Sequence, residues 1–294
     1  MMNFIVYILV YPLIWLLSIL PFRVLYIISD GFYLLLYYVI GYRKKVVYDN
    51  LKLAFPNKSE KEILNIRKKF YHHFVDIFIE MIKSFTISKK EINKRATYTN
   101  INFLNDLHKN GKSIILVGAH YANWEWLFGL SSHINYKSYA AFTTVNNKYF
   151  NNKVLKSREH FGFNLKSSSN IISEIEKNKK TNIQALYGLI SDQSPQIKKT
   201  HYWGNFLGVK VPIHTGAEML AKKNGFDIVY IATKKLKRGY YESTFSLITS
   251  DAKKYADFEL TDIYLRKLEA QIHEEPAYYF WTHKRFKHKD KAPK

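Results

Sequence analysis

A histidine and a carboxylate lie close together in the sequence, directly after a run of apolar residues. His120 follows Ser113–Gly118, whose small and β-branched residues are typical of a buried strand, and Glu125 comes five positions later. A neutral imidazole can take a proton from a hydroxyl or an amine, and a carboxylate on its other ring nitrogen can fix its tautomer and orientation. The pair therefore predicts a general base at His120 oriented by Glu125, although a histidine followed by an acid at this distance also occurs often by chance.

Two further polar clusters follow predicted strands. Arg158 lies near the end of a predicted helix, and Asp192-Gln193 comes just after the apolar run Ala185–Ile190. Ligands of open α/β sheets bind beyond the carboxyl ends of the strands. The planar guanidinium suits a phosphate or a developing oxyanion, and the carboxylate and amide can position a polar head group. The alternatives are a solvent-exposed arginine and an Asx turn that holds only its own loop.

The composition excludes several other kinds of site. The chain has no cysteine, which excludes disulfides, thiolate metal sites and a thiol nucleophile. It has no G-x-S-x-G nucleophile turn, no Gly-rich phosphate loop and no HExxH zinc motif. His72 and Asp76 share one face of a predicted helix, but no third ligand is obvious, so we predict no metal site.

The rest of the chain alternates predicted strands with predicted helices. Ser59 as N-cap and Glu62 in the capping-box position predict the start of a helix with apolar residues at helical spacing through Met81. The other predicted helices cover residues 101–109, 123–132, 149–160, 171–178, 213–223 and 260–273. The predicted strands cover residues 113–118, 139–145, 183–191, 227–235 and 241–249, the last two joined by a turn containing Gly239. This order predicts an α/β fold with a mixed central sheet flanked by helices.

The N-terminal stretch is almost entirely apolar from Phe4 to Ile40. A single straight helix of this length would exceed the hydrocarbon core of a bilayer, so Pro21 is the predicted break between two segments. The two segments form either a membrane hairpin or one membrane span followed by an interfacial helix. The alternative is an apolar helical hairpin buried in the core of a soluble protein. A cleaved signal peptide is not expected, because no basic segment precedes the apolar run. Basic residues at 43–45 predict, by the positive-inside rule, that the remaining chain is cytoplasmic. We expect residues 1–42 to form a membrane anchor and residues 43–294 one catalytic domain.

The overall charge predicts an anionic partner. The formal net charge is +21. Aromatic residues make up 16% of the chain, a content that suits a surface in contact with both water and an apolar phase such as a bilayer. Anionic lipid, nucleic acid and an acidic protein all satisfy the charge, and a lysine-rich base composition accounts for part of it. A non-catalytic basic protein that binds nucleic acid or the membrane surface is the rival interpretation. It would need clustered basic residues with exposed aromatics, whereas the lysines here are dispersed.

Five elements, in order, resemble the bacterial lipid A biosynthesis acyltransferases, the lauroyl and myristoyl transferases of the lysophospholipid acyltransferase superfamily. His120 to Glu125 is similar to the family's H-x4-D/E motif, with Glu in the acidic position. Arg158 matches the family's arginine, and Asp192-Gln193 matches its Asp-Gln element. The remaining two elements are the segment Trp203–Gly208 with Val211–Gly216 and Met219–Ala221, and the terminal W-x-H-(K/R)-R-F signature at Trp281–Phe286.

The resemblance implies a glycerolipid-acyltransferase-like fold and acyl transfer from a thioester to a hydroxyl of a lipid A precursor. It implies His120 as general base, Glu125 as its orienting acid, Arg158 at the oxyanion or a phosphate, and Asp192 and Gln193 on the acceptor. No cofactor is implied beyond the donor thioester, carried by acyl carrier protein or, as the alternative, by coenzyme A. The implied partners are acyl carrier protein, a membrane lipid and the bilayer, without nucleic acid, at the cytoplasmic face of the bacterial inner membrane.

Two departures from the family pattern concern the acceptor. Ser194-Pro195 stands where many members have a further acid or polar residue, and Phe206-Leu207-Gly208 stands where an aromatic pair before Gly is common. A lysophospholipid or an aminolipid therefore remains an alternative acceptor.

Overall fold

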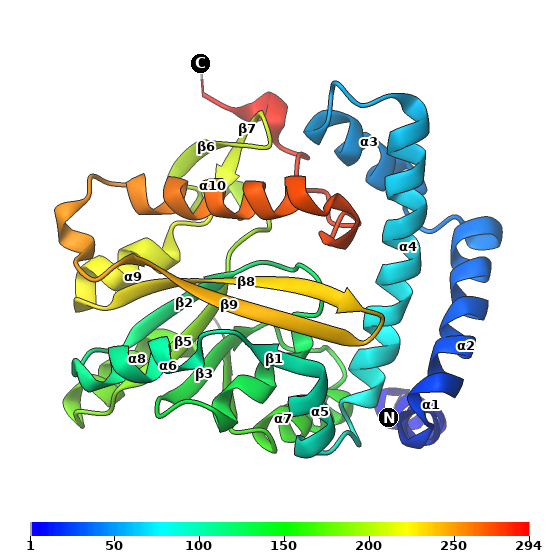
Figure 1. The fold of residues 1–294 in the computed structure, drawn as a ribbon, viewed down its shortest axis with the longest axis horizontal. Coiled ribbons are helices and arrows are strands. Elements are labelled where there is room, and N and C mark those ends of the chain that lie inside the picture. Colours follow the sequence, from blue (N-terminus) through cyan, green and yellow to red (C-terminus); the bar gives the residue numbers. More distant parts are fainter. Residues whose placement is uncertain (1, 168, 294) are drawn as a thin grey trace.

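The computed structural model describes residues 2–167 and 169–293. Its centre is a seven-stranded sheet with the order β1-β9-β8-β2-β5-β3-β4, with helices packed around it (Figure 1). Only β8 and β9 pair antiparallel, and the other neighbours in this sheet are parallel. The strands are β1 (Ala96–Tyr98), β2 (Ile114–Gly118), β3 (Lys137–Phe142), β4 (Phe163–Ser167), β5 (Ala185–Ile190), β8 (Asp227–Lys237) and β9 (Tyr240–Thr249). The predicted α/β class and mixed sheet are confirmed, with the late hairpin supplying the antiparallel pair.

The sheet separates two hydrophobic cores, because successive residues of a strand point to opposite faces. Ile115 and Val117 of β2 belong to the larger core, with Leu265 and Leu268. Ile114 and Leu116 of the same strand belong to the smaller core. All five residues of β2 are buried, as expected for a central parallel strand covered on both faces.

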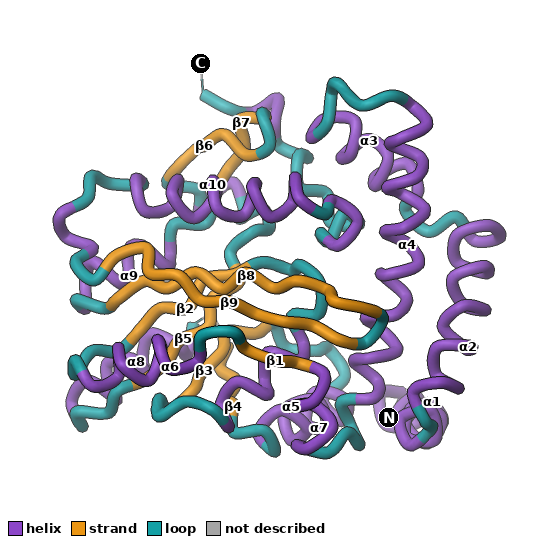
Figure 2. The backbone as a smooth tube through the Cα atoms, viewed as in Figure 1, coloured by secondary structure: helices purple, strands orange, loops and turns teal. Residues whose placement is uncertain are grey.

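Five α-helices precede β1 in the described residues, and most later strands are separated by helices. Figure 2 colours helices, strands and loops separately. The helices are α1 (Met2–Ile19), α2 (Phe22–Leu34), α3 (Lys44–Ala54), α4 (Glu60–Lys83), α5 (Lys89–Arg95), α6 (Ile101–Lys109), α7 (Lys148–Glu159), α8 (Asn170–Lys180), α9 (Gly216–Asn224) and α10 (Glu259–Glu274). The predicted capping box of α4 is confirmed: the Ser59 hydroxyl accepts from the Glu62 amide, and the Ser59 amide donates to the Glu62 carboxylate. Short 3₁₀ segments cover Glu125–Ser132, Ile197–Lys199, Ala252–Lys254, Pro276–Tyr278 and Lys289–Lys291.

Two apolar helices pack along one side of the molecule. α1 and α2 are separated at Leu20 and Pro21, as predicted, and α2 continues as a π-helical turn, Leu35–Ile40, that ends at Gly41 with φ +66°. Both helical stretches are long and apolar enough to cross a membrane by length and composition. α2 runs beside α4, which lies between it and the sheet (Figure 1).

Several local predictions differ from the structure for tertiary reasons. The helix predicted from Asn123 is a 3₁₀ segment that starts at Glu125, because Ala122 has φ +50° and the Asn123 side chain accepts the Trp126 amide. The helix predicted from Ile213 begins at Gly216, because β7 (Val209–Ile213) pairs with β6 (Tyr202–Phe206) in a separate two-stranded sheet. The short strands β1 and β4 were not predicted, since five or fewer residues give little periodic signal.

Candidate active site

His120 and Asp192 form a hydrogen-bonded pair beyond the central strands. Nδ1 of His120 lies 2.8 Å from Oδ1 of Asp192, and the amide Nε2 of Gln193 lies 3.4 Å from the same ring nitrogen. The Asp192 side chain is 1% exposed, and that of His120 is 24% exposed. Nε2 of His120 makes no hydrogen bond within residues 2–167 and 169–293. The pair therefore has the form of a carboxylate-oriented base whose second nitrogen is available to a substrate.

Strand register explains why these two residues meet. β2 and β5 are parallel neighbours, with Gly118 opposite Ile190 at their carboxyl ends. His120 and Asp192 each come two residues after these partners, so the two loops leave the sheet side by side. Gly118 is also needed for packing, because a Cβ at that position would lie 2.8 Å from Cγ2 of Ile231.

The carboxylate changes the acidity of the imidazole. Burial by itself lowers the pKa of His120, but the charge of Asp192 and the hydrogen bond to it outweigh burial, with a smaller contribution from the charge of Glu125. The net result is a pKa above the ordinary value for histidine. Burial raises the pKa of Asp192, but the charge of His120 and the hydrogen bonds hold it below its ordinary value. Asp192 is thus an anion that stabilises a protonated His120.

Glu125, expected to orient His120, has a different partner. Its carboxylate accepts a hydrogen bond from Nη2 of Arg158, and the two side chains are 10% and 15% exposed. The guanidinium of Arg158 also lies over the Phe128 ring, 4.9 Å from its centroid. Sequence spacing predicted that Glu125 folds back onto the ring of His120. The structure instead gives that hydrogen bond to Asp192, because the register of the neighbouring strand brings the Asp192 carboxylate closer to Nδ1.

The C-terminal segment forms one wall of the site. The Phe280 amide donates to the His120 carbonyl at 3.1 Å, and the Ala122 amide donates to the Tyr278 carbonyl at 3.0 Å. The rings of Phe280 and Trp124 lie 5.8 Å and 5.2 Å from that of His120, centroid to centroid. This aromatic wall was not among the predicted site residues, although the terminal signature begins at the very next residue, Trp281.

The terminal signature itself is anchored at both ends. Asn50 donates to the carbonyls of Trp281 and His283, both at 2.8 Å. Arg285 is 2% exposed; its Nη1 donates to the Ser194 hydroxyl at 3.2 Å and to the Pro212 carbonyl at 3.1 Å. The signature therefore joins α3 to the loop that carries Asp192 and Gln193.

The half-buried histidine of the signature, His283, is uncharged. Burial lowers the pKa of His283 to about 4, although the charge of Asp192 opposes the shift. The guanidinium of Arg285 lowers that pKa further. His120 is thus the histidine near Asp192 with a raised pKa, while His283 stays neutral at physiological pH.

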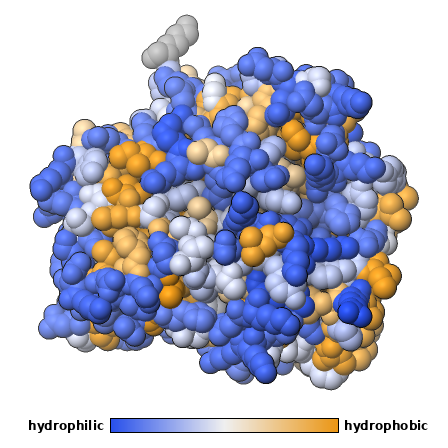
Figure 3. Space-filling view, viewed as in Figure 1, coloured by the Kyte–Doolittle hydropathy of each residue, from blue (hydrophilic) through white to orange (hydrophobic). Residues whose placement is uncertain are grey.

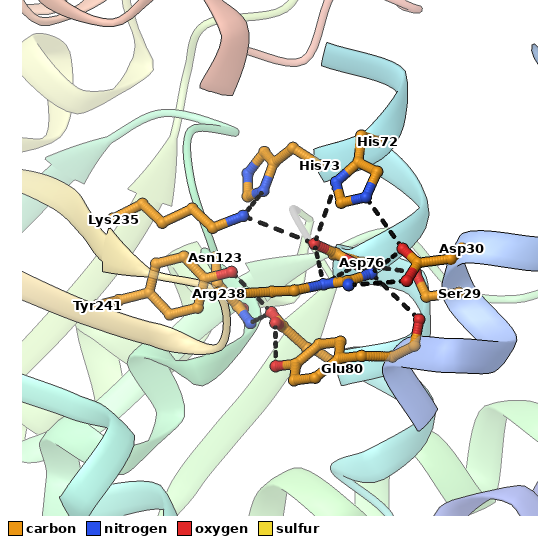
Figure 4. Close-up of polar contacts among 11 residues, drawn as sticks. Ser29, Asp30, His72, His73, Asp76, Glu80, Asn123, Lys235, Arg238 and Tyr241 are labelled. Carbon is orange, nitrogen blue, oxygen red and sulfur yellow. Dashed lines mark hydrogen bonds and ion pairs between the residues drawn. The ribbon is translucent and has the colours of Figure 1, made fainter. Parts of the chain in front are cut away.

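A buried carboxylate holds the loop between His120 and Glu125. Glu80 of α4 accepts hydrogen bonds from Asn123 at 2.6 Å, from Tyr241 at 2.8 Å and from Tyr26 at 2.8 Å (Figure 4). Burial raises the pKa of Glu80 to about 7. Asn123 in turn accepts the Trp126 amide, so Glu80 fixes the turn that follows the histidine.

His72, for which no metal site was predicted, contacts two carboxylates that join α2 and α4. Its Nε2 lies 3.0 Å from Asp30 of α2 and its Nδ1 lies 3.9 Å from Asp76. Within the part of the chain that the structure describes, no three His, Cys, Asp or Glu side chains are grouped to hold a metal ion.

Comparison with known proteins identifies the family of the chain. The model of the family described as bacterial lipid A biosynthesis acyltransferase matches residues 1–288. The chain is also similar to the lipid A biosynthesis lauroyltransferase of Escherichia coli (strain K12), with 24% identity over 284 residues that cover 93% of this chain and 89% of that protein. These matches confirm the predicted family and argue against the non-catalytic interpretation. The chain belongs to the bacterial lipid A biosynthesis acyltransferases, and it is an acyltransferase.

Proposed function

We propose that the protein moves a fatty acyl group from acyl carrier protein to a hydroxyl of a lipid A precursor at the cytoplasmic face of the inner membrane. The observation that carries this proposal is the His120–Asp192 pair, with Nδ1 and Oδ1 2.8 Å apart beyond the carboxyl ends of β2 and β5. Family membership supports lipid A biosynthesis as the process.

The proposed reaction is a direct transfer with His120 as the base. Nε2 takes the proton of the acceptor hydroxyl while its oxygen attacks the thioester carbonyl. The tetrahedral intermediate then collapses: the new C–O bond remains, the C–S bond breaks, and the leaving thiolate takes the proton back from the imidazolium. Asp192 keeps the proton on Nδ1 during the cycle and stabilises the imidazolium. No acyl-enzyme is needed, which agrees with the lack of cysteine in the chain.

Arg158 is the proposed stabiliser of negative charge. The tetrahedral intermediate carries an oxyanion that needs hydrogen-bond donors, and a guanidinium can supply two in a fixed plane. Glu125 accepts from Nη2 of Arg158, which leaves the other guanidinium donors to face an oxyanion or a phosphate of the acceptor. In this proposal Glu125 is a positioning residue for Arg158 and contributes only charge at His120. Gln193, next to the ring, is the proposed contact of the acceptor head group.

The apolar helices and the basic charge support a site at the membrane. α1 and α2 expose apolar side chains, and the chain carries a net charge of +21. A cationic surface attracts anionic lipid and an acidic carrier protein. The phosphates of coenzyme A suit the same cationic surface, so acyl carrier protein as the donor rests on the family resemblance.

A product analysis with competing donors and acceptors tests the proposal. The purified full-length protein is incubated with radiolabelled acyl carrier protein or acyl coenzyme A, and with a lipid A precursor, a lysophospholipid or an aminolipid. Mass spectrometry of the labelled product is expected to show an ester on the lipid A precursor, formed fastest from the carrier protein. Preferential acylation of the lysophospholipid or the aminolipid would mean that this lipid, and not a lipid A precursor, is the acceptor. A faster reaction with acyl coenzyme A would mean that coenzyme A, and not acyl carrier protein, carries the donor acyl group.

A further inference from the structure

Both ends of α1 are held by the catalytic domain. At its start, the side chain of Asn147 donates to the Asn3 carbonyl at 2.7 Å. At its end, Nζ of Lys83 donates to the carbonyls of Ser18 and Leu20 at 2.8 Å and 2.9 Å. The Ser18 side chain is fully buried.

The middle of α1 rests on the same surface. Tyr7 packs against Tyr149 and Phe150, with ring centroids 5.5 Å and 5.4 Å apart. Nζ of Lys153 lies 4.7 Å from the centroid of the Tyr11 ring. The less exposed positions of α1 form one stripe along the helix: Tyr7, Tyr11, Ile14, Leu17 and Ser18. The docked side of α1 is therefore continuous from end to end.

α2 is clamped at its centre by a charged cluster (Figure 4). Arg238, in the turn between β8 and β9, contacts Asp30 of α2 at 2.7 Å and Asp76 of α4 at 2.6 Å. The Ser29 hydroxyl donates to the same Asp76 carboxylate at 2.8 Å. Nζ of Lys235 lies 3.6 Å from Asp76, and the Asp76 side chain is fully buried.

The two ends of the second apolar stretch are held as well. At its start, the guanidinium of Arg95 stacks 3.5 Å from the centroid of the Phe22 ring. Near its end, Tyr37 packs against Tyr71 with centroids 5.3 Å apart, and Nζ of Lys44 lies 4.4 Å from the Tyr37 ring. This helix also lies along the catalytic domain for its whole length.

The opposite faces of both helices are apolar and exposed. In Figure 3 the hydrophobic colour gathers at the right edge and the lower right of the molecule, over these helices. Leu9 is 66% exposed, Ile27 is 71% exposed and Val39 is 76% exposed. The other exposed apolar side chains here are Met2, Phe4, Ile5, Val6, Ile8, Val10, Leu13, Trp15, Leu16, Ile19, Val24, Phe32, Leu34, Leu35, Tyr38 and Ile40.

These contacts are incompatible with helices that cross the bilayer. Asn3 and Ser18 are separated by about 22 Å of helix, most of a hydrocarbon core of about 30 Å. If α1 stood along the membrane normal, Asn147 and Lys83 would lie at opposite interfaces, and Lys153 would lie at mid-depth in hydrocarbon. The cluster at Asp30 would force the hairpin turn with Arg238 to the same depth. Charged and polar groups of a hydrated domain are strongly disfavoured there.

We propose that α1 and α2 lie in the plane of the membrane, with their outer faces in the lipid of one leaflet, and that neither crosses the bilayer. The occupant of the apolar face is anionic phospholipid, because exposed Arg23 and Lys45 flank the apolar stretches and the chain is strongly cationic. The inference rests on the membrane association in the proposed function and specifies its geometry.

Single cysteines test the topology, because the chain has no cysteine of its own. Asn3→Cys, Arg23→Cys and Lys45→Cys report the start of α1, the junction and the end of the apolar region. Each full-length variant is expressed in a Gram-negative host and exposed to a membrane-impermeant maleimide in spheroplasts and in inverted inner-membrane vesicles. Lys45→Cys is the matched control for the side of the catalytic domain, since its side chain is 87% exposed.

In-plane helices predict one labelling pattern for all three variants, with reaction in inverted vesicles and none in spheroplasts. Reaction of Arg23→Cys alone in spheroplasts would mean a spanning hairpin, and reaction of Asn3→Cys alone would mean a single span by α1. Either pattern would overturn the inference while leaving the membrane association intact. Recovery of all variants in the soluble fraction would instead overturn the membrane association and point to a second copy as the cover of the apolar face.

A depth measurement checks the geometry independently. Spin labels at Ile5→Cys, Leu9→Cys and Leu13→Cys, on the exposed face of α1, are compared by their collision rates with oxygen and with a water-soluble nickel chelate in vesicles of phosphatidylethanolamine and phosphatidylglycerol. Equal, shallow depths are expected for the three labels. A maximum at Leu9 with shallower neighbours would contradict the in-plane arrangement.

Discussion

Nδ1 of His120 lies 2.8 Å from Oδ1 of Asp192, although 72 residues separate the two in sequence. The contact exists because β2 and β5 are parallel neighbours whose last residues, Gly118 and Ile190, are in register. The register of the sheet thus brings the base and its carboxylate together. In the proposed mechanism Asp192 keeps the proton on Nδ1, and Nε2 receives the proton of the acceptor.

Asp192→Asn should greatly reduce activity without unfolding the protein. The amide is close in size to the carboxylate, but it cannot stabilise the imidazolium and can select the wrong tautomer of His120. We expect kcat/KM to fall by about 10²- to 10⁴-fold. Near-normal kcat/KM in the folded variant would exclude Asp192 as the residue that positions His120.

The pH dependence of kcat/KM should also move in Asp192→Asn. His120 must be neutral to act as a base, so wild-type activity should rise with pH through a midpoint above the ordinary pKa of histidine. In the variant, burial still lowers the pKa of His120 and the largest opposing contribution is gone, so the midpoint should move to lower pH. An unchanged midpoint would mean that another group controls the acid limb.

Glu125 and Arg158 should behave as one unit in a double-mutant cycle. If Glu125 acts through Arg158, then Glu125→Ala with Arg158→Ala should lose about as much kcat as Arg158→Ala alone. The acid limb of the pH profile should move less in Glu125→Ala than in Asp192→Asn, because the charge of Glu125 raises the pKa of His120 less than that of Asp192 does. Losses that multiply, together with a shift as large as that in Asp192→Asn, would restore Glu125 as the orienting acid of His120.

Glu80 should make stability fall as pH rises. Burial raises its pKa from 4.5 to about 7 in the folded chain, so between these pH values the folded state binds a proton that the unfolded state has lost. The stability from this group is complete below pH 4.5 and is lost as pH approaches 7, by about 3 kcal/mol in total. Denaturant unfolding at several pH values should show this slope in the wild type and a flatter one in Glu80→Gln; equal slopes would contradict the assignment.

Arg238→Ala should destabilise the packing of α2 and α4. Removal of the guanidinium leaves the buried carboxylate of Asp76 with two more distant basic neighbours, Lys235 at 3.6 Å and His72 at 3.9 Å. We expect a loss of about 3 kcal/mol or more in the free energy of unfolding. Lys45→Ala, which breaks an exposed pair with Asp49, is the control and should change stability by less than about 1 kcal/mol. Equal effects of the two substitutions would mean that the cluster at Asp76 is not a structural clamp.

Local sequence signals predicted the elements but not the contacts between them. The capping box at Ser59, the apolar strand before His120 and the turn at Gly239 depend on neighbours in the chain, and all three were confirmed. The partner of His120 depends on which strand lies beside β2, which no local spacing encodes. Asp192 was predicted as a site residue from its place after a strand, but its bond to His120 required the register of the sheet.

The terminal signature illustrates the same limit. Its residues were recognisable in the sequence, but the contact of neighbouring Phe280 with the His120 loop follows from long-range backbone hydrogen bonds. The hydrogen bond from Asn50 to the Trp281 carbonyl joins parts of the chain that are 231 residues apart. Such contacts have no periodic pattern, because each is made once.

The most direct test of His120 as the catalytic base is the activity of His120→Ala in the acyl-transfer assay. The variant is compared with wild type and with His201→Ala, an exposed histidine outside the site, after circular dichroism has shown that all three are folded. We expect that His120→Ala forms no detectable acylated lipid, whereas His201→Ala retains full activity. Retention of more than a few per cent of wild-type activity by His120→Ala would contradict it.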